Sequence, residues 1–438
     1  MIDINGNCCK NCKIFTDNIE EEALAMVYKI LSNPVFKESK IRIMPDTHAG
    51  KGIVIGFTCP VVNYVNPSHV GVDIGCGIES IFFQNPLPED KYAIFEHRLK
   101  SSIPTGVNQN ETTMFKRNEF YSFLNNEIQK AYQSSNGRIS FIEFSNDKDV
   151  EKWCKHIRMD ITTLYHSIGT LGGGNHFLEY DEGDEHYAFT VHTGSRNLGQ
   201  KVHNYWAKIA NGPSFDKNAF NLEVKEFVKN WTGNKEDIQS EINKIRSRHL
   251  SNVHNGYLSD DNLKGYLTDM VICQAYAKYN RKVILDKAAN IMVDICNGNK
   301  VIDHISTTHN YIDFGDMILR KGAIRSYSGE KMIIPFNMRD GIAVCEGKSN
   351  EDWNYSAPHG SGRAMSRSKA KQDIDIEKFK EQMKDVYSTS VGMSTLDEAP
   401  DAYKPTNEII ENIKATCNVL FFMKPKINIK DSSNEECD

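Results

Sequence analysis

The segment GYLTDMVICQAYAKYNRKVILDKAANIMV, residues 265–293, is the longest regular pattern in the chain. Its apolar residues recur at helical spacing, which predicts one long helix from about Lys264 to Val293. Short segments rich in β-branched and aromatic residues lie on both sides of it, among them ESIFF (79–83), YAFTVH (187–192) and MIIPF (332–336). Helices mixed with runs of short strands predict an α+β protein built around a large mixed sheet.

The N-terminal part of the chain is also predicted to contain helices and short strands. TDNIEEEALAMVYKILSNP (16–34) predicts a helix capped by Thr16 or Asp17 and ended by Pro34. IRIM (41–44) and GIVIGF (52–57) are predicted strands on either side of the polar loop MPDTHAGKG (44–52). The charged region from about 101 to 166 is predicted to be helical.

Composition narrows the class of protein. The 438 residues are 39% apolar and 25% charged, as in ordinary globular enzymes. The N-terminus has no signal-peptide pattern, no apolar run reaches the length of a bilayer span, and the eleven cysteines are odd in number and irregularly spaced. We therefore expect a cytoplasmic protein with reduced thiols. The net charge of −6 means that any contact with nucleic acid must be local.

The polar motifs point to a single unit. They are scattered from Asp46 to Lys430, and each lies in a loop beside a strand or a glycine cluster. There is no internal repeat and no obvious linker. Because loops on a rigid scaffold usually carry the chemistry, we expect these loops to converge in one catalytic domain over residues 1–438. The polar end, 431–438, is predicted to be disordered.

Five residues form a candidate metal site. Asp73 and Cys76 stand in the glycine-rich turn DIGCG, His176 follows the glycines of GTLGGGNHFLEY, His192 ends YAFTVH, and His309 lies in THNYID. Each alone is weak evidence, but imidazole, thiolate and carboxylate together suit Zn²⁺, Mn²⁺ or Fe²⁺. A thiolate can also bridge two ions. Cys8, Cys9 and Cys12 offer a competing site, but no second C-x-x-C or C-x-x-H follows, which favours free thiols.

His359 is the candidate for group transfer. In APHGSGRAMSR it precedes a Gly-Ser-Gly turn whose backbone amides can face phosphate oxygens, and Arg363 and Arg367 follow. A histidine in this position can act as base, ligand or nucleophile, and the residues alone do not choose between these roles. The other glycine cluster matches neither a P-loop nor a dinucleotide fingerprint.

At this point the chain resembles one family, the RtcB RNA ligases. The similar segments occur in the family's order and span nearly the whole chain: MPDTHAGKG, VGVDIGCGI, GTLGGGNHFLEY, VHTGSRNLG, YLTDMVICQAYAKYNRK, THNYID, RKGAIRS, NEDWNYSAPHGSGRAMSR and DEAPDAYK. The resemblance implies a GTP- and Mn²⁺-dependent ligase that joins an RNA 3′-phosphate or 2′,3′-cyclic phosphate to a 5′-hydroxyl, in RNA repair or tRNA splicing. It also implies a GMP–histidine intermediate.

The resemblance assigns roles to individual residues. It implies that His359 is the nucleophile, with Asp46 as an acidic neighbour, and that two manganese ions share the ligands Asp73, Cys76, His176, His192 and His309, Cys76 bridging. The implied GTP contacts are Asn175, His176, Phe177, Leu178, Glu179, His309, Asn310, Pro335, Phe336, Asn337, Met338, His359, Gly360, Ser361, Gly362 and Lys430. Lys430 is expected at the guanine. For the RNA phosphates the candidates are Lys321, Arg325, Arg363 and Arg367.

One departure and two alternatives stay open. The family's small-residue stretch is PFNMRDGIAV (335–344) here, and Ile342 stands where a serine that reads guanine is expected, which leaves guanine selectivity open. A metal-dependent phosphoesterase could use the same five ligands, with a metal-bound water and His359 as general acid. A non-catalytic protein that binds RNA ends, or one that the metal merely stabilises, is the other alternative.

Overall fold

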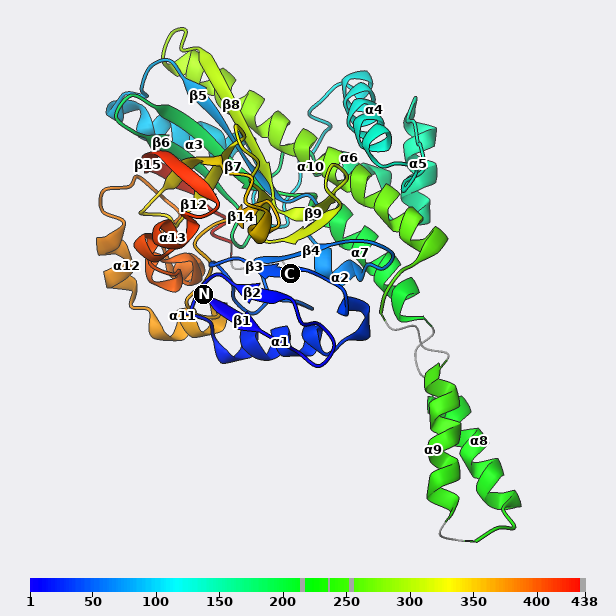
Figure 1. Ribbon diagram of the computed structural model, residues 1–438. Coiled ribbons are helices and arrows are strands. Elements are labelled where there is room, and N and C mark those ends of the chain that lie inside the picture. The colour runs from blue at the N-terminus through cyan, green and yellow to red at the C-terminus, as the bar shows by residue number, and fades with distance from the viewer. Residues whose placement is uncertain (213–216, 235–236, 252–255, 434–438) are drawn as a thin grey trace.

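Three β-sheets and the helices that cover them form the fold, and the computed structural model describes residues 1–212, 217–234, 237–251 and 256–433 (Figure 1). The largest sheet has seven strands, each antiparallel to its neighbours. Their order is β12 (Lys331–Pro335), β13 (Ile342–Gly347), β15 (Cys417–Ile429), β6 (Phe177–Glu182), β7 (Tyr187–Thr193), β5 (Gly77–Phe83) and β8 (Val301–Thr308). The two outermost strands, β12 and β8, also contact each other, so the sheet nearly closes into a barrel.

A six-stranded sheet lies beside it. Its order is β1 (Ile2–Ile4), β2 (Cys12–Ile14), β3 (Ile41–Ile43), β4 (Phe57–Pro60), β10 (Ile318–Lys321) and β9 (Asn310–Asp313), with only β2 and β3 parallel. The third sheet pairs β11 (Ala323–Arg325) with β14 (Ser356–Pro358).

The three sheets meet at short connections. His309 alone separates β8 of the large sheet from β9 of the six-stranded sheet, and Gly322 alone separates β10 from β11 of the small sheet. The backbone N–H of Gly322 donates to the carbonyl of His309 at 2.7 Å, which holds the two connections together. The loops at this junction therefore converge from all three sheets.

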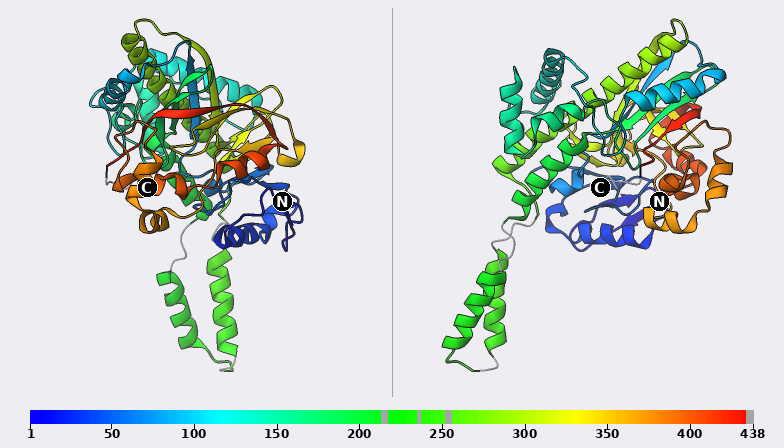
Figure 2. Two further views of the ribbon diagram at one scale, coloured as in Figure 1. Left: turned by 90° about the vertical axis from the view of Figure 1, so that its left-hand side faces the viewer. Right: turned by 180° about the vertical axis from the view of Figure 1, so that it is seen from behind.

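The long helix α10 (Asp260–Ile295) is the central helix of the molecule. It packs on β5 and β7 and against α3 (Tyr92–Ser102), α4 (Arg117–Ser134) and α7 (Arg196–Asn211). The other helices are α1 (Glu21–Leu31), α2 (Pro67–Val70), α5 (Asp147–His156), α6 (Ile161–His166), α11 (Arg367–Asp373), α12 (Ile376–Gln382) and α13 (Thr406–Ile413). The hairpin of α8 (Lys217–Asn230) and α9 (Ile238–Ser251) projects away from the rest (Figures 1 and 2). No helix among the described residues is long and apolar enough to cross a bilayer.

The structure confirms the predicted α+β class, the long helix and the helical region between 101 and 166. Two local predictions are wrong. Helix α1 begins at Glu21 instead of after Thr16 or Asp17, because Glu20 already takes the N-cap position with extended backbone. GIVIGF becomes a strand only at Phe57, since Gly56 has a φ of +83° that turns the chain out of the sheet. Of the tail predicted to be disordered, residues 434–438 lie outside the described part.

Candidate functional site

Four neighbouring strands bring the predicted metal ligands to one edge of the large sheet. His192, near the end of β7, pairs with Ile78 of β5 on one side and with Phe177 of β6 on the other. Cys76 directly precedes β5, His176 directly precedes β6, and His309 directly follows β8. Because neighbouring antiparallel strands alternate in direction, the starts of β5 and β6 meet the ends of β7 and β8. The strand register thus explains why residues more than 200 positions apart form one cluster.

The donor atoms fall into two groups of three that share the Cys76 thiol. One group is Asp73, Cys76 and His176, and the other is Cys76, His192 and His309, each with its donor atoms within 4.8 Å of one another. The Cys76 Sγ lies 3.5 Å from Nε2 of His176 and 3.3 Å from Nε2 of His192. Nε2 of His176 lies 3.0 Å from Asp73 Oδ2, and Nε2 of His192 lies 3.3 Å from Nε2 of His309. This arrangement is compatible with a metal site in which both groups share the Cys76 thiol.

Hydrogen bonds behind the cluster orient the rings. Nδ1 of His176 lies 3.0 Å from the carbonyl of Leu171, and Nδ1 of His192 lies 3.1 Å from that of Asn175. A nitrogen that donates to a carbonyl leaves the other ring nitrogen with its lone pair, so Nε2 of both rings is available to a metal. The backbone N–H of Ser195 donates to Oδ1 of Asp73 at 3.0 Å, which leaves Oδ2 facing the cluster.

The protonation states suit metal binding. Burial lowers the pKa of both His192 and His309 well below the usual value, so both imidazoles are neutral. Burial would raise the pKa of Asp73, but its interactions with His176, Cys76 and Arg196 together outweigh burial and lower that pKa, so the carboxylate is charged. Burial and the charge of Asp73 raise the pKa of Cys76 well above the usual value. A thiolate at this place therefore needs a bound cation to stabilise it.

His359 lies beside this cluster, at the end of β14. Its ring centroid is 4.7 Å from that of His309. Nδ1 of His359 lies 2.7 Å from Oδ2 of the fully buried Asp46, and the backbone N–H of His359 donates to the same oxygen at 3.2 Å. The Nδ1–H donor fixes the tautomer, so the free lone pair of this imidazole is on Nε2.

Two further residues, Gly362 and Lys404, hold the loops that carry Asp46 and His359. A Cβ at Gly362, which has a φ of +70°, would lie 2.0 Å from the carbonyl oxygen of Asp46, so only glycine allows the loops to approach this closely. The buried Lys404 ammonium donates to the carbonyls of Pro45 and Thr47 at 3.1 and 2.9 Å. The backbone N–H of Lys404 donates to Gly362.

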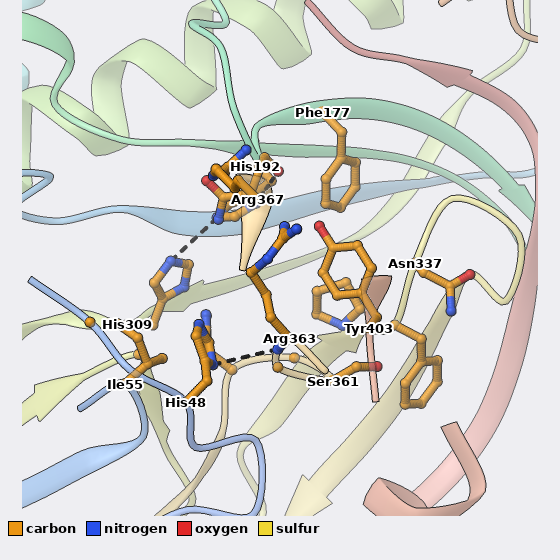
Figure 3. A pocket seen from close by; sticks show the side chains of 18 of the residues that line it. His48, Ile55, Phe177, His192, His309, Asn337, Ser361, Arg363, Arg367 and Tyr403 are labelled. Carbon is orange, nitrogen blue, oxygen red and sulfur yellow. Dashed lines mark hydrogen bonds between the residues drawn. The ribbon is translucent and has the colours of Figure 1, made fainter. Parts of the chain in front are cut away.

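A cavity of about 530 Å³ opens at the cluster, a size typical of small-molecule sites (Figure 3). In Figure 3, His309 and His48 lie at one side and Asn337 at the other, with Arg363 and Tyr403 between them. Most of the predicted GTP contacts line this cavity: Asn175, Phe177, Glu179, His309, Asn310, Pro335, Phe336, Asn337, Met338, His359, Gly360, Ser361, Gly362 and Lys430.

Lys430, which lines the cavity, belongs to a group of buried charges. Nζ of Lys430 lies 2.9 Å from Oε2 of Glu398, the last residue of the 3₁₀ helix Met393–Glu398. Burial would raise the pKa of Glu398, but Lys430 and Arg367 outweigh it and lower that pKa to about 2. Glu179 and Asp181 form a second buried pair, in which burial and the charge of Asp181 raise the pKa of Glu179. That pair therefore retains a proton.

Some predicted residues lie elsewhere. Leu178 packs in the core with the large sheet, and Lys321 is buried, with Nζ 3.3 Å from the carbonyl of Val70. Arg325 pairs with Asp313 and Glu330 outside the cavity. Arg363 and Arg367 do line the cavity, and both contact Glu398.

Ile342 faces away from the cavity. It lies on β13 with none of its surface exposed, and it belongs to a core cluster with Ile78, Ile333 and Met423. The position at which the resemblance places a serine that reads guanine is therefore a packing position in this chain.

Four residues of the site were not predicted from the sequence. Tyr403 and His48 line the cavity, while Glu398 and Lys404 hold its charged and backbone groups. Three of the four lie in or next to DEAPDAYK, a segment quoted above without a role. The segment was thus recognisable from the sequence, but the neighbouring residues did not indicate which of its polar side chains would be buried.

Comparison with known proteins agrees with this geometry. A family model described as "tRNA-splicing ligase RtcB" matches residues 27–431. The "RNA-splicing ligase RtcB" of Escherichia coli K12 is 26% identical over 434 residues, which cover 94% of this chain and 95% of that protein. The "tRNA-splicing ligase RtcB" of Nanoarchaeum equitans is 24% identical over 462 residues, covering 90% of this chain and 86% of that protein.

Proposed function

The chain belongs to the RtcB family, and from this premise we propose that it is an RNA ligase that joins 3′-phosphate or 2′,3′-cyclic phosphate ends to 5′-hydroxyl ends. We further propose that it uses GTP and two Mn²⁺ ions and forms a GMP–His359 intermediate. Such a ligase serves RNA repair or tRNA splicing.

One observation carries the proposal. His359 presents a free Nε2 beside His309, and hence beside the five donors, in a cavity lined by the predicted nucleotide contacts. A carboxylate on the other ring nitrogen also occurs in metal-ligating histidines, so it is the cavity in front of His359, lined by the Gly360-Ser361-Gly362 turn, that favours a nucleophile. Nucleophile, phosphate-binding turn and metal donors therefore belong to one site.

In the proposed reaction, His359 carries the GMP group from GTP to the RNA 3′-phosphate. Nε2 of His359 attacks the α-phosphorus of GTP, a P–N bond forms, and the bond to the bridging oxygen breaks with loss of pyrophosphate. Asp46 accepts the hydrogen bond from Nδ1–H and stabilises the positive charge that develops on the ring. An oxygen of the RNA 3′-phosphate then displaces His359 from the GMP phosphorus. Finally the oxygen of the 5′-hydroxyl attacks the phosphorus of the RNA 3′-phosphate and the bond from that phosphate to GMP breaks. The hydroxyl proton is released to solvent, and a phosphodiester and free GMP result. A cyclic end is first opened by water to a 3′-phosphate.

Asp73, Cys76, His176, His192 and His309 would hold the metal ions, since their donor atoms and protonation states fit such ions. When bound, Mn²⁺ would neutralise phosphate charge and orient the triphosphate towards His359. Arg363 and Arg367, which line the cavity, are the proposed contacts to RNA or nucleotide phosphates. Since these residues come from segments throughout the sequence, the proposal also treats residues 1–438 as one catalytic domain.

Labelling with α-³²P-GTP and Mn²⁺ tests the proposal. We expect the wild-type protein to acquire a covalent label that acid removes, as a P–N bond requires, and His359→Ala to acquire none. The matched control is His97→Ala, on the surface helix α3 outside the cavity, which should label as the wild type does. A substrate with a cyclic phosphate at one end and a 5′-hydroxyl at the other should then be sealed.

Equal labelling of the His359→Ala variant would show that another group is the nucleophile. Release of phosphate from RNA ends without joining would favour a phosphoesterase. Binding of RNA ends with neither reaction would favour the non-catalytic alternative.

A further inference from the structure

Two consecutive residues in the middle of α10, Asn280 and Arg281, reach from the helix into the loops that carry the metal ligands. Both side chains are almost completely buried, and neither lines the cavity. They belong to the segment YNRK (279–282), to which the proposed function gives no role. Their partners are mostly backbone groups.

Arg281 connects the two halves of the metal site. One guanidinium nitrogen, Nη1, donates to the carbonyl of Gly75 and to the carbonyl of Thr193, both at 2.9 Å. Gly75 lies between the ligands Asp73 and Cys76, while Thr193 directly follows the ligand His192. The side chain of Arg281 therefore forms hydrogen bonds to the backbone beside both groups of donor atoms.

Glu79 fixes the guanidinium itself. Nε of Arg281 donates to Oε1 of Glu79 at 2.9 Å, and both side chains are at most 3% exposed. Glu79 lies on β5, three residues after Cys76, and its other oxygen is 3.2 Å from Nε2 of His304 on β8. The arginine is thus oriented by the strands whose ends carry Cys76 and His309.

Asn280 acts on the third loop. Its Oδ1 accepts hydrogen bonds from the backbone N–H groups of Gly169 and Thr170 at 2.7 and 3.2 Å. Its Nδ2 donates to the carbonyls of Thr170 and Gly194 at 3.1 and 3.4 Å. Gly169 and Thr170 begin the segment that leads to His176, and Thr170 precedes Leu171, whose carbonyl orients the His176 ring.

We propose that Arg281, together with Asn280, is a positioning residue that sets the spacing of the two metal-binding halves by holding the backbone of the three ligand-bearing loops to α10. This inference rests on the metal site of the proposed function. Glycine-rich loops have little side-chain packing of their own, so their geometry depends on such fixed hydrogen bonds. The planar guanidinium donates hydrogen bonds to Glu79 and to the carbonyls of Gly75 and Thr193 at the same time. A lysine ammonium lacks this planar arrangement of donors and cannot form all three.

The test measures binding of Mn²⁺ alone, without GTP or RNA, to chelator-treated full-length protein by isothermal titration calorimetry. We expect Arg281→Lys to bind Mn²⁺ about 10- to 100-fold more weakly than the wild type, as is usual when the groups that orient ligands are altered. Arg320→Lys is the matched control. Arg320 is also completely buried, pairs with Asp316 at 2.6 Å and donates to the carbonyls of Asn354 and Tyr355, none of which is a metal ligand. Because none of these partners lies in a ligand-bearing loop, Arg320→Lys should bind Mn²⁺ with the affinity of the wild type.

Asn280→Asp provides a second variant in case Arg281→Lys does not fold, which circular dichroism will show. It keeps the shape of the side chain but has no donor for Thr170 or Gly194, so it too should weaken Mn²⁺ binding. If the folded variants bind Mn²⁺ as tightly as wild type and Arg320→Lys, the positioning role is wrong. Wild-type protein that binds Mn²⁺ but forms no GMP adduct would contradict the proposed function instead, and the Mn²⁺ affinities would still decide the role of Arg281.

Discussion

Asp46 and His359 are 313 positions apart in the sequence, and a 2.7 Å hydrogen bond joins Oδ2 of Asp46 to Nδ1 of His359. The same carboxylate oxygen also accepts the backbone N–H of His359. Asp46 follows β3 of the six-stranded sheet, and His359 follows β14 of the small sheet. The bond therefore depends on how two sheets meet, and it leaves the free lone pair of the His359 ring on Nε2.

Asp46→Asn should slow formation of the GMP adduct by about 10²- to 10⁴-fold, the range of catalytic contributions from groups of this kind. Asparagine keeps the shape and can still accept the backbone N–H of His359, but it carries no charge to stabilise the imidazolium. Thermal stability should change little. The measurement is the single-turnover rate of labelling. Asp286→Asn, which alters an exposed pair with Lys282, is the control. A rate equal to that of the wild type would remove Asp46 from the mechanism.

If the proposed two-ion site is right, Cys76→Ala should lower the metal content from two ions to one or fewer per chain, because Cys76 is the donor that both groups of described residues share. Inductively coupled plasma mass spectrometry of the Mn²⁺-loaded protein measures this, with circular dichroism to establish folding. Cys154→Ala, another fully buried cysteine on α5, should retain two ions. If Cys76→Ala also retains two, the thiol does not bridge them.

The proposed metal ligands could be selected from the sequence because each lies at or near a strand end and three of them, Asp73, Cys76 and His176, lie in glycine-rich turns, which is a local pattern. The residues that hold the ligand-bearing loops in place could not be predicted in this way. Lys404 and Arg281 act on backbone carbonyls of loops more than 80 positions away, and such contacts leave no periodicity in the sequence. The strand predicted at GIVIGF fails for a related reason. Its apolar run is that of a strand, but Gly56 donates to the carbonyl of Lys321, a distant contact that bends the chain.

Ile342→Ser should destabilise the fold without changing nucleotide choice. Ile342 is completely buried in an apolar cluster, so losing its side chain and burying a hydroxyl should cost about 3–5 kcal/mol. Ile342→Val should cost only about 1 kcal/mol. Urea unfolding gives both values, and labelling with GTP and ATP gives the selectivity. A large change in the GTP-to-ATP ratio with little loss of stability would mean that position 342 does reach the nucleotide.

Glu398 should make the protein sensitive to acid. Its pKa is lowered from the ordinary 4.5 to about 2 in the folded chain, since the charges of Lys430 and Arg367 outweigh burial. The unfolded chain then binds more protons between these values. The contribution of Glu398 to stability is complete above about pH 4.5 and is lost as the pH falls towards 2, at no more than about 1.4 kcal/mol per pH unit.

Glu398→Gln separates this contribution from that of the other carboxylates. The variant should be less stable at pH 7 by about 3 kcal/mol, because it leaves Lys430 buried without its partner charge. The difference between the free energies of unfolding of the wild type and the variant should shrink by about 1 kcal/mol between pH 4.5 and 3.5. Glu377→Gln, on the surface beside Lys380, should show no such change. A difference that stays constant over this range would mean that Glu398 does not titrate there, and that its charge does not stabilise the buried end of the cavity.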